Sequence, residues 1–484
     1  MMAKQYESVI GLEVHVELST ATKIFCGCST RFGGETNTQT CPVCTGMPGS
    51  LPVLNKQVVE NALKLGEALN CQVNQYSRFD RKNYFYPDNP QNYQISQLYL
   101  PICIDGWLEI DTKAGSKKIR IHEMHMEEDA GKLLHDEWED SSLVDYNRSG
   151  VPLIEVVSEP DMRTAEEVIA YLEKLRLRCQ YLGISDCKLQ EGSMRVDVNQ
   201  SIREEGSQEF GTRTEMKNLN SFKAISRAIA GEKERQIELL EDGGEVIQET
   251  RRWDDNKETS FSMRSKEDAN DYRYFPDPDL QPMVISDEWI ARAKDEKPEF
   301  QEERAKRFSQ DYDLPEYDAS VLTQSVHLAE LFENTVKLSE YPKKVANWFM
   351  GEVLRQVKEK QLEIEDLNFT PKHLADLIAA VERKEISGTN AKEVFEKIMD
   401  EDAPPLTYMK DAGLVMVTDS NALEEAVEAV LKQNPKALKE YLEGKEKVMG
   451  FLVGNVMKAM KGKADASKVR EIIVEVAGQA RNDS

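Results

Sequence analysis

The segment Val9–Leu18 reads VIGLEVHVEL, and its pattern sets the architecture of the first part of the chain. Apolar side chains stand at every second position, and because successive side chains of a strand point to opposite faces, they share one face. The other face then carries Glu13, His15 and Glu17. The segment therefore predicts a strand with one face in a core and the other lined by polar groups.

A second segment, further along the chain, repeats this pattern. Met194–Ile202 (MRVDVNQSI) alternates apolar residues with polar ones, among them Asp197 and Asn199. Between the two strands, Thr164–Leu182 has apolar residues at the spacing of an amphipathic helix. From about residue 5 to 285 the sequence thus mixes strands with helices, and we expect an α+β domain.

The chain after about Ser286 is helical in pattern. Thr370-Pro371 is typical of a helix start, with a capping residue followed by proline at the first helical position. Asn421, with Glu424 three residues on, predicts a capping box for a further helix. We therefore predict three domains, which are 1–290, 291–407 and 408–484.

The composition is acidic, with 62 Lys+Arg against 87 Asp+Glu in 484 residues and a net charge of −25. The 40% of hydrophobic residues argues against general disorder. No apolar run approaches the roughly 20 residues that span a bilayer, and Met1–Glu7 lacks a signal core, so we expect a soluble cytoplasmic protein. Bulk acidity taken alone argues against a nucleic-acid partner.

The acidity is unevenly distributed. Residues 408–484 contain twelve basic and twelve acidic groups, so the whole excess of −25 lies before them. Within this tail, Lys445–Lys468 contains six lysines against two acidic residues. Such a basic stripe can contact phosphates, although a solvated helix face explains it equally well.

Four of the eight cysteines form a pattern with metal-ligand spacing. Cys26-Gly-Cys28 is followed, after twelve residues, by Cys41-Pro-Val-Cys44. Two close pairs joined by a short loop can bring four thiolates to one tetrahedral zinc ion, and four protein ligands make such a site structural. A disulfide is the alternative, but without a secretory signal an oxidising compartment is not indicated. In a redox CxxC the second pair would be idle.

Carboxylates recur on the polar faces of several predicted strands, in Glu13, Glu17 and Asp197 and in the segments 125–129 and 214–217. A single polar strand face is normally just solvated. Several in one sheet bring like charges together, which costs free energy unless cations neutralise them. Mg²⁺ prefers oxygen ligands and accompanies nucleotide phosphates. Because the sequence has no GxxxxGK[ST] loop and no GxGxxG after a strand, ATP would be held through metal-bound phosphates over a sheet.

Long ordered motifs resemble one family, the GatB/GatE family of tRNA-dependent amidotransferase subunits, in its bacterial and organellar branch. Besides VIGLEVHVEL and the cysteine pattern, they are FDRKNYFYPDNPQNYQISQ (79–97), HMEEDAGK (125–132), SLVDYNRSGVPLIEVVSEPD (142–161), KLQEGSMRVDVNQSIR (188–203), FGTRTEMKNLNSF (210–222), ETRRWD (249–254) and DYRYFPDPDL (271–280). The archaeal-type members insert a further domain after the first, and the sequence after Leu280 has no room for it.

The resemblance implies a fold and a reaction. The first domain would be an antiparallel-sheet cradle similar to glutamine synthetase, followed by an all-helical domain and a small helical YqeY-like tail domain that contacts tRNA. The family corrects Glu-tRNA(Gln) or Asp-tRNA(Asn): ATP activates the side-chain carboxylate, and ammonia from the glutaminase, which is the A subunit, then forms the amide. A small C subunit completes the heterotrimer. A non-catalytic, zinc-stabilised tRNA-binding scaffold is the alternative function, and clustered repulsive carboxylates argue against it.

The resemblance also implies site residues. The family's magnesium site maps onto Glu13, His15, Glu128, Glu191, Asp197 and Glu215, and of these all except Glu191 are the expected catalytic residues. Since simple alternation turns Glu128 away from His125, we expect a bulge or strand end there. The basic residues expected to contact ATP or the tRNA 3′ end, unless they pair with the site's own carboxylates, are Arg81, Lys82, Arg148, Lys217, Arg251 and Arg273.

Overall fold

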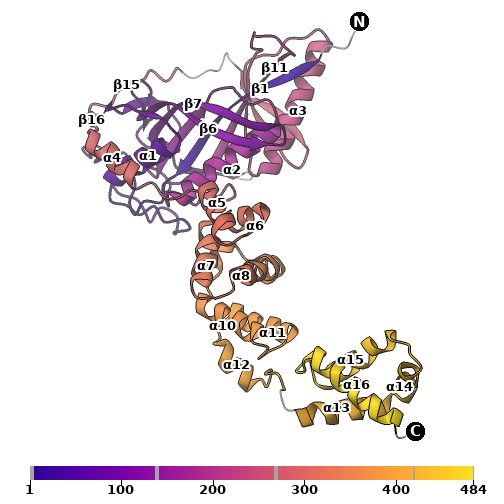
Figure 1. Ribbon diagram of the computed structural model, residues 1–484. Helices are drawn as coiled ribbons and strands as arrows, with labels where there is room; N and C mark the ends of the chain where they lie inside the picture. Colours follow the sequence, from indigo (N-terminus) through magenta and orange to yellow (C-terminus); the bar gives the residue numbers. More distant parts are fainter. Residues whose placement is uncertain (1–4, 137–140, 266–270, 418–419, 483–484) are drawn as a thin grey trace. The chain divides into compact units, whose positions relative to one another are not determined.

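The strand predicted around VIGLEVHVEL is β1 (Tyr6–Glu17), which lies in the interior of a nine-stranded sheet (Figure 1). The computed structural model describes residues 5–136, 141–265, 271–417 and 420–482. Contacts within the chain divide it into two units, Met1–Phe300 and Gln301–Ser484, and the sheet belongs to the first.

The nine strands come from distant parts of the first unit. Every neighbouring pair is antiparallel except β12 with β13, which is parallel. In order across the sheet they are β14 (Thr259–Ser265), β13 (Glu249–Asp254), β12 (Thr214–Lys217), β11 (Met194–Glu204), β1, β10 (Pro152–Ser158), β7 (Gly115–Glu128), β6 (Cys103–Thr112) and β2 (Gln72–Val73).

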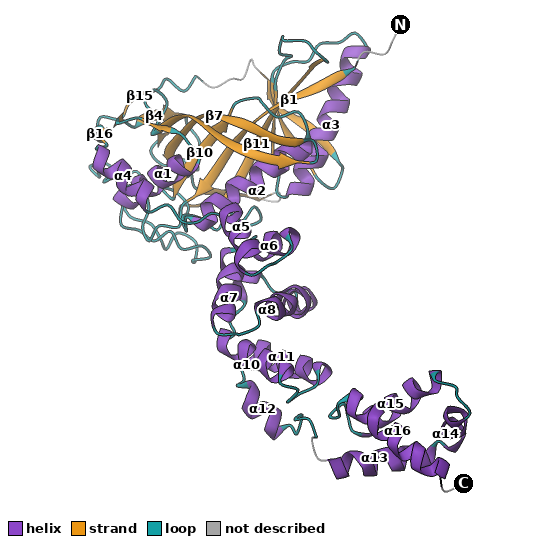
Figure 2. Cartoon of the chain, viewed as in Figure 1, coloured by secondary structure: helices purple, strands orange, loops and turns teal. Residues whose placement is uncertain are grey.

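Three helices pack against the sheet (Figure 2). They are α1 (Lys56–Ala68) on β6 and β7, α2 (Ala165–Tyr181) on β6, and α3 (Phe222–Glu241) on β11 and β14. The Thr164 hydroxyl caps α2 by accepting from Glu167 N, so the helix predicted over Thr164–Leu182 is confirmed between its two cap residues. A fourth helix, α4 (Asp287–Asp295), contacts α1.

The core of the first unit lies between these helices and one face of the sheet. Ile10, Leu12, Val14 and Val16 of β1 are all at most 1% exposed and belong to this core. Burying an aliphatic side chain of this size contributes about 1.5–3 kcal/mol, so the alternation in the segment fixes which face of β1 points inward. The apolar face predicted from the sequence is confirmed.

The remaining strands of the first unit form small sheets around the large one. One has the order β15 (Phe275–Pro276), β4 (Asp80–Asn83) and β5 (Tyr93–Ser96). Two further pairs are β16 (Met283–Val284) with β3 (Tyr76–Ser77), and β8 (Lys132–Asp136) with β9 (Ser141–Asp145).

The second unit is built from helices, and an α+β chain with a helical C-terminal region is therefore confirmed. One hydrophobic core runs from Phe308 to Met409 and another from Leu423 to Ile473. The helices are α5 (Gln301–Asp311), α6 (Glu316–Leu322), α7 (Val326–Lys337), α8 (Pro342–Trp348), α9 (Leu354–Lys360), α10 (Pro371–Glu382), α11 (Gly388–Glu401), α12 (Pro405–Asp411), α13 (Ser420–Gln433), α14 (Pro435–Leu442), α15 (Lys447–Ala459) and α16 (Ala466–Asn482). A π-helical turn, Phe349–Val353, connects α8 to α9.

Two helix starts were predicted in this unit. Thr370 is the N-cap residue of α10 and Pro371 its first residue, as predicted. Helix α13 begins at Ser420, one residue before the predicted cap Asn421. The domain boundaries at 290 and 408 stay predictions. Among the residues that the structure describes, no helix is both long and apolar enough to cross a membrane.

Candidate functional site

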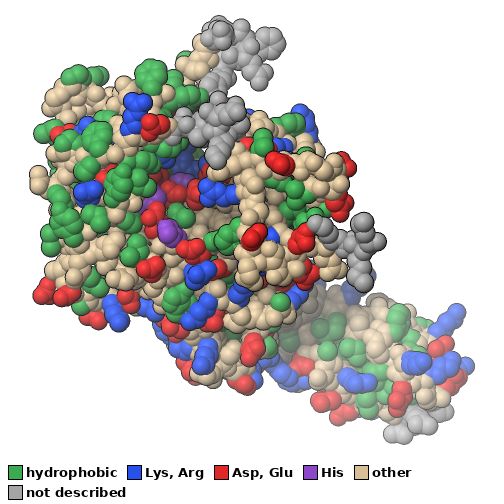
Figure 3. Space-filling model, turned by 90° about the horizontal axis from the view of Figure 1, so that it is seen from above, with side chains coloured by type: hydrophobic (Ala, Val, Ile, Leu, Met, Phe, Trp, Pro, Cys, Tyr) green, Lys and Arg blue, Asp and Glu red, His purple; other side chains and the backbone are tan. Residues whose placement is uncertain are grey.

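Strand pairing brings polar side chains together on the sheet face opposite the three helices. Glu13 of β1 lies opposite Asp197 of β11, and Asn199 of β11 lies opposite Glu215 of β12. On the other side of β1, His15 lies opposite Glu155. Because alternate residues of a strand share a face, these pairs line one surface. Figure 3 shows acidic, basic and histidine side chains gathered in a hollow of the molecule.

The first cluster on this face is the carboxylate–lysine group, which consists of Glu13, Asp197, Glu215 and Lys217. One oxygen of each carboxylate lies within 4.8 Å of the others. Lys217 Nζ forms ion pairs with Asp197 and, at 2.9 Å, with Glu215 Oε1. Asn199 Nδ2 donates to Glu13 Oε1 at 2.9 Å. When all three carboxylates are ionised, one lysine leaves two negative charges uncompensated, which suits a divalent cation.

Titration in this group follows its burial and its neighbours. Burial, with Glu155 and Glu215 nearby, raises the pKa of Glu13 above its ordinary value. Burial alone would lower the pKa of Lys217, but Asp197 and Glu215 outweigh it and the pKa is raised. Lys217 therefore stays charged, and the repulsion between the carboxylates contributes to the raised pKa of Glu13.

The second cluster, the carboxylate–histidine group, consists of His15, His125, Glu127 and Glu155. Glu155 Oε2 lies 3.5 Å from His15 Nε2 and 3.0 Å from His125 Nε2. Glu127 Oε1 lies 3.7 Å from His15 Nε2. One ligand atom from each of His15, Glu127 and Glu155 falls within 4.8 Å of the others, so this group also offers three metal ligands.

Protonation in this second group follows the same logic. Burial alone would lower the pKa of His15, but Glu155 outweighs it, so the pKa of His15 is raised. Burial alone would raise the pKa of Glu155, but the two imidazoles hold it well below its usual range. Protons on the histidines thus balance the carboxylates, as the lysine does in the first cluster. A divalent cation could replace those protons.

Glu128 and Glu191, predicted with the metal ligands, lie elsewhere. Strand β7 ends at Glu128 with regular pairing to Pro152, so the side chain keeps its alternate side. Its Oε1 accepts from Ile95 N at 3.0 Å and Gln91 Nε2 at 2.6 Å, and burial raises its pKa to about 8. Glu191 pairs with Lys188 at 2.9 Å on the loop before β11.

The structure also adds three side chains that were not predicted as ligands, His125, Glu127 and Glu155. In the segment PLIEVVS, Glu155 shares one face of the strand with Leu153 and Val157, which are both apolar. Alternation alone therefore gives no reason to select it. Its importance comes from His15 and His125 on the two neighbouring strands, and that register is a property of the fold.

Most of the predicted basic residues are paired within the chain. Arg81 bonds Asp277 and Asp279, Arg148 lies 3.4 Å from Asp129, Arg251 pairs with Glu249, Arg273 pairs with Asp271, and Lys217 belongs to the carboxylate–lysine group. Lys82 lies 4.9 Å from the Tyr272 ring centroid. Burial alone would lower the pKa of Lys82, but Glu127 and the neighbouring tyrosines outweigh it and raise it. Internal ion pairing, the alternative considered for these residues, therefore accounts for five of the six.

A cavity of about 730 Å³ opens beside the carboxylate–lysine group. Its walls include Asp197 and Lys217 of the carboxylate–lysine group, together with Arg148, Arg195 and Glu191. Arg195 bonds both oxygens of the buried Asp129, at 3.2 and 2.9 Å. The cavity is within the 300–1,000 Å³ range typical of cofactor and ligand sites, so it can take a nucleotide-sized group next to the carboxylates.

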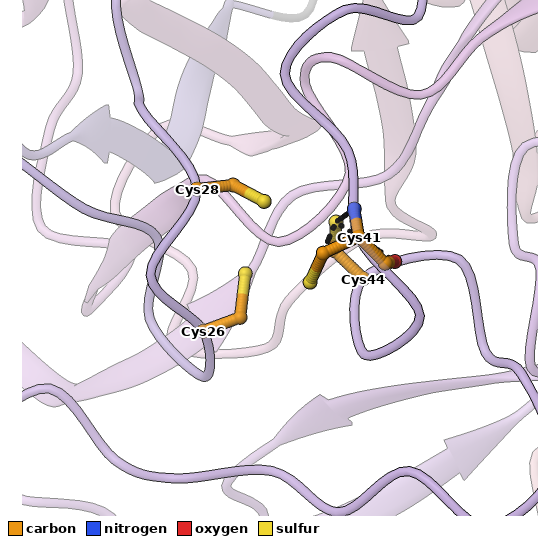
Figure 4. A group of neighbouring side chains, drawn as sticks. All are labelled: Cys26, Cys28, Cys41 and Cys44. Carbon is orange, nitrogen blue, oxygen red and sulfur yellow. Dashed lines mark hydrogen bonds between the residues drawn. The ribbon is translucent and has the colours of Figure 1, made fainter.

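The four cysteines of the predicted zinc pattern converge (Figure 4), with their sulfurs within 4.8 Å of one another. Cys41 Sγ and Cys44 Sγ lie 3.9 Å apart, close to the roughly 3.8 Å between sulfurs of a tetrahedral site with Zn–S bonds of about 2.3 Å. Fully buried Lys23 places Nζ 3.5 Å from Cys44 Sγ. The hydrogen bond from Cys26 and the nearby Lys23 lower the pKa of Cys44 to about 4. All four thiols are free of disulfides.

Comparison with known proteins gives full-length matches. The sequence matches the GatB/GatE catalytic domain over residues 8–291 and the GatB domain over residues 330–476. It is similar to proteins named as the B subunit of aspartyl/glutamyl-tRNA(Asn/Gln) amidotransferase. The relative from Agathobacter rectalis is 63% identical over 98% of this chain and all of its own length, and that from Lachnoclostridium phytofermentans is 60% identical over 99% and all of its own. One from Carboxydothermus hydrogenoformans is 52% identical over 97% of this chain and 98% of its own length.

Proposed function

The chain belongs to the GatB/GatE family, and we propose that it is the B subunit of an amidotransferase that repairs misacylated tRNA. The reaction is a ligation that forms a carbon–nitrogen bond with glutamine as the amide donor. Its substrates are Glu-tRNA(Gln) or Asp-tRNA(Asn), and its products are Gln-tRNA(Gln) or Asn-tRNA(Asn). The observation that carries this proposal is the convergence of three carboxylates and a lysine beside a nucleotide-sized cavity, in a chain that matches these relatives along their whole length.

The chemistry has two steps. A carboxylate is a poor electrophile because it lacks a good leaving group. In the first step an oxygen of the substrate's side-chain carboxylate attacks the γ-phosphorus of ATP, and ADP leaves. In the second step ammonia attacks the acyl carbon, phosphate leaves, and the amide remains. The difficulty of the first step is electrostatic, because two anions must approach each other.

The residues of the site can reduce this repulsion between the two anions in two ways. Lys217 holds a positive charge between Asp197 and Glu215, where an approaching phosphate oxygen can share it. Glu13, Asp197 and Glu215 form a set of three oxygen donors, which suits Mg²⁺. His15, Glu127 and Glu155 form a mixed set of one imidazole nitrogen and two carboxylate oxygens, which is less typical of Mg²⁺. When bound there, Mg²⁺ would neutralise charge on the phosphates and on the substrate carboxylate.

We place a structural zinc ion at Cys26, Cys28, Cys41 and Cys44. The spacing of the sulfurs and the low pKa of Cys44 support it, since a thiolate is the form that binds metal. Buried Lys23 would offset part of the negative charge of a four-thiolate site. The zinc would hold a loop and take no part in the reaction.

The partners follow from the same proposal. Among the residues that the structure describes, neither carboxylate cluster offers a nucleophile for hydrolysing glutamine. This agrees with a separate glutaminase, the A subunit, as the source of ammonia, with a small C subunit completing the complex. The tail, 408–484, would contact the tRNA, and the first unit would share its fold with glutamine synthetase. The scaffold alternative is not favoured, because a scaffold would gain nothing from uncompensated carboxylates.

The deciding experiment is reconstitution. We expect the chain, co-expressed with the A and C subunits, to convert misacylated tRNA(Gln) or tRNA(Asn) to the amide only when ATP, glutamine and Mg²⁺ are all present. Leaving out each component in turn supplies the controls. Binding of tRNA without amidation of either misacylated tRNA would instead support the scaffold.

A further inference from the structure

The loop 29–40, which joins the two cysteine pairs, is anchored at both ends. The cysteine cluster lies at its base. Further along, Asn37 Nδ2 donates to Val144 O at 2.9 Å, and Asn37 Oδ1 accepts from Tyr146 N at 2.7 Å. Asn147 Nδ2 donates to Glu35 O at 2.7 Å. The loop is therefore fixed against the end of β9 and the residues that follow it.

The front of this loop forms part of the wall of the large cavity. The segment 30–34 lines the same cavity as Asp197 and Lys217. The turn favours glycine at position 33, because Gly33 has φ +79°. This turn directs the preceding residue, Phe32, outward.

Phe32 is 72% exposed, and unlike other exposed phenylalanines of the first unit, such as Phe85 and Phe210, it lines this cavity. Its neighbour Arg31 is also exposed, and the described part of the chain gives the Arg31 guanidinium no ion pair. By contrast, Arg148 and Arg195 deeper in the cavity are occupied by Asp129. An exposed aromatic ring beside an available cation is the pair of groups that binds single-stranded nucleic acid, by stacking on a base and attracting phosphates.

We propose that Phe32 is the stacking platform for the 3′-terminal adenine of the tRNA acceptor strand, with Arg31 beside the strand's phosphates. This inference rests on the proposed function and assigns a positioning role within it. The amino acid is esterified to the terminal ribose, so a base held at the cavity wall places the side-chain carboxylate inside the cavity. Phe32 would then act on the reaction by orienting the substrate.

ATP also carries an adenine, and the exposure of Phe32 argues for the tRNA. Small ligands bury about 70–90% of their surface in concave sites, which calls for an enclosed aromatic wall. A polymer must instead pass from the cavity into solvent, and the segment 31–38 is exposed at every position. A ring at this rim is placed for a chain that continues outward.

The test uses the reconstituted complex of the full chain with its partner subunits. We expect Phe32→Ala to raise the KM for misacylated tRNA about tenfold, with the KM for ATP unchanged, and Phe32→Trp to stay near the wild type. The matched control is Phe210→Ala, which removes a ring that is 65% exposed elsewhere in the first unit. A direct readout is tRNA whose 3′-terminal adenosine is replaced by 2-aminopurine riboside, because stacking quenches its fluorescence. Phe32→Ala should lose the quenching and Phe210→Ala should keep it.

The outcomes separate this inference from the proposed function. Unchanged tRNA KM and quenching in Phe32→Ala, in a complex that amidates, would overturn the platform and leave the function standing. A rise confined to the KM for ATP would assign the ring to the nucleotide and overturn the inference as well. Quenching that depends on Phe32 in a complex that amidates no tRNA would uphold the platform and refute the function.

Discussion

Acidic side chains are arranged differently in the two units. In the second unit many of them pair with basic residues, some one helical turn away, as in Lys372 with Asp376 and Lys397 with Glu401, and some on another helix, as in Lys360 with Asp400. In the first unit, residues from β1, β11 and β12 place three carboxylates around one lysine. The local pairs leave no charge to neutralise, and exposed pairs of this kind contribute about 0.3–0.5 kcal/mol each. The gathered carboxylates leave an excess that only a bound cation or a proton can relieve.

The difference shows what net charge reports. The value of −25 describes neither region well, because pairing removes the effect of many charges and clustering magnifies that of a few. Carboxylates of equal formal charge are therefore expected to respond very differently to the same substitution. The response should be largest where carboxylates gather and smallest where one carboxylate is held by its own hydrogen bonds.

The largest effect is expected for Asp197→Asn. The substitution removes an oxygen of the proposed Mg²⁺ site and the partner of Lys217 at nearly constant volume. Amidation should therefore fall about 1,000-fold, comparable to losing a key electrostatic interaction in an active site. Transamidation in the reconstituted complex measures it, with tRNA binding retained. Asp376→Asn, the same change in a helical pair, should leave the rate within about twofold. Equal effects from the two variants would remove the distinction between the units.

The cysteine cluster is a second gathering of candidate metal ligands in the first unit. Cys44→Ser removes the thiol whose pKa is about 4, and we expect zinc affinity to fall about 100-fold and zinc content to drop from about one ion per chain. Elemental analysis and a competing chelator measure both quantities. Cys71→Ser, outside the cluster, should retain its zinc. A wild-type chain purified without zinc, and unable to take it up, would contradict the assignment.

A smaller effect is expected in the basic stripe of the second unit, Lys445–Lys468, where lysines outnumber acidic residues. Lys458 and Lys461 are exposed in the basic stripe of the tail, and replacing both by alanine should weaken tRNA binding about tenfold. The plot of log affinity against log salt should also become less steep, by about one for each phosphate that the variant no longer neutralises. Lys432→Ala, which removes a lysine already paired with Glu428, is the control. Equal losses in both variants would mean that the stripe has no special role.

The sequence predicted individual strands and helices more readily than the contacts between side chains of different strands. Alternation in VIGLEVHVEL was enough to separate Leu12 and Val14 from Glu13 and His15, because the period of a strand is local information. The cysteine cluster was also accessible, since four ligands in 19 residues depend on spacing alone. Glu155 was missed because its meeting with His15 and His125 depends on cross-strand register. Glu128 was grouped with residues that lie apart from it because of the family resemblance, although alternation alone turns it away from them. Register is set by the packing of the whole sheet.

The smallest effect concerns a carboxylate of the second unit that is held by hydrogen bonds. Asp402 Oδ1 accepts from Thr370 N at 2.8 Å and lies 2.8 Å from His373 Nδ1. Burial acts to raise the pKa of Asp402, but the hydrogen bonds from Thr370 and His373 outweigh burial and lower it. A lowered folded-state pKa stabilises the fold above the unfolded value of about 3.9, and that stabilisation is lost as the pH falls through the folded pKa. Asparagine tolerates the φ of +47° at this position, so Asp402→Asn removes the charge without straining the backbone. The opening free energy that hydrogen exchange reports for the α10 amides at pH 7 should fall by about 1 kcal/mol. The gap between variant and wild type should close as the pH falls through the folded-state pKa of Asp402, because the wild-type carboxyl is itself protonated below that pKa. A gap that persisted there would mean that Asp402 acts through its shape, and the contrast between paired and gathered carboxylates would then rest on the first unit alone.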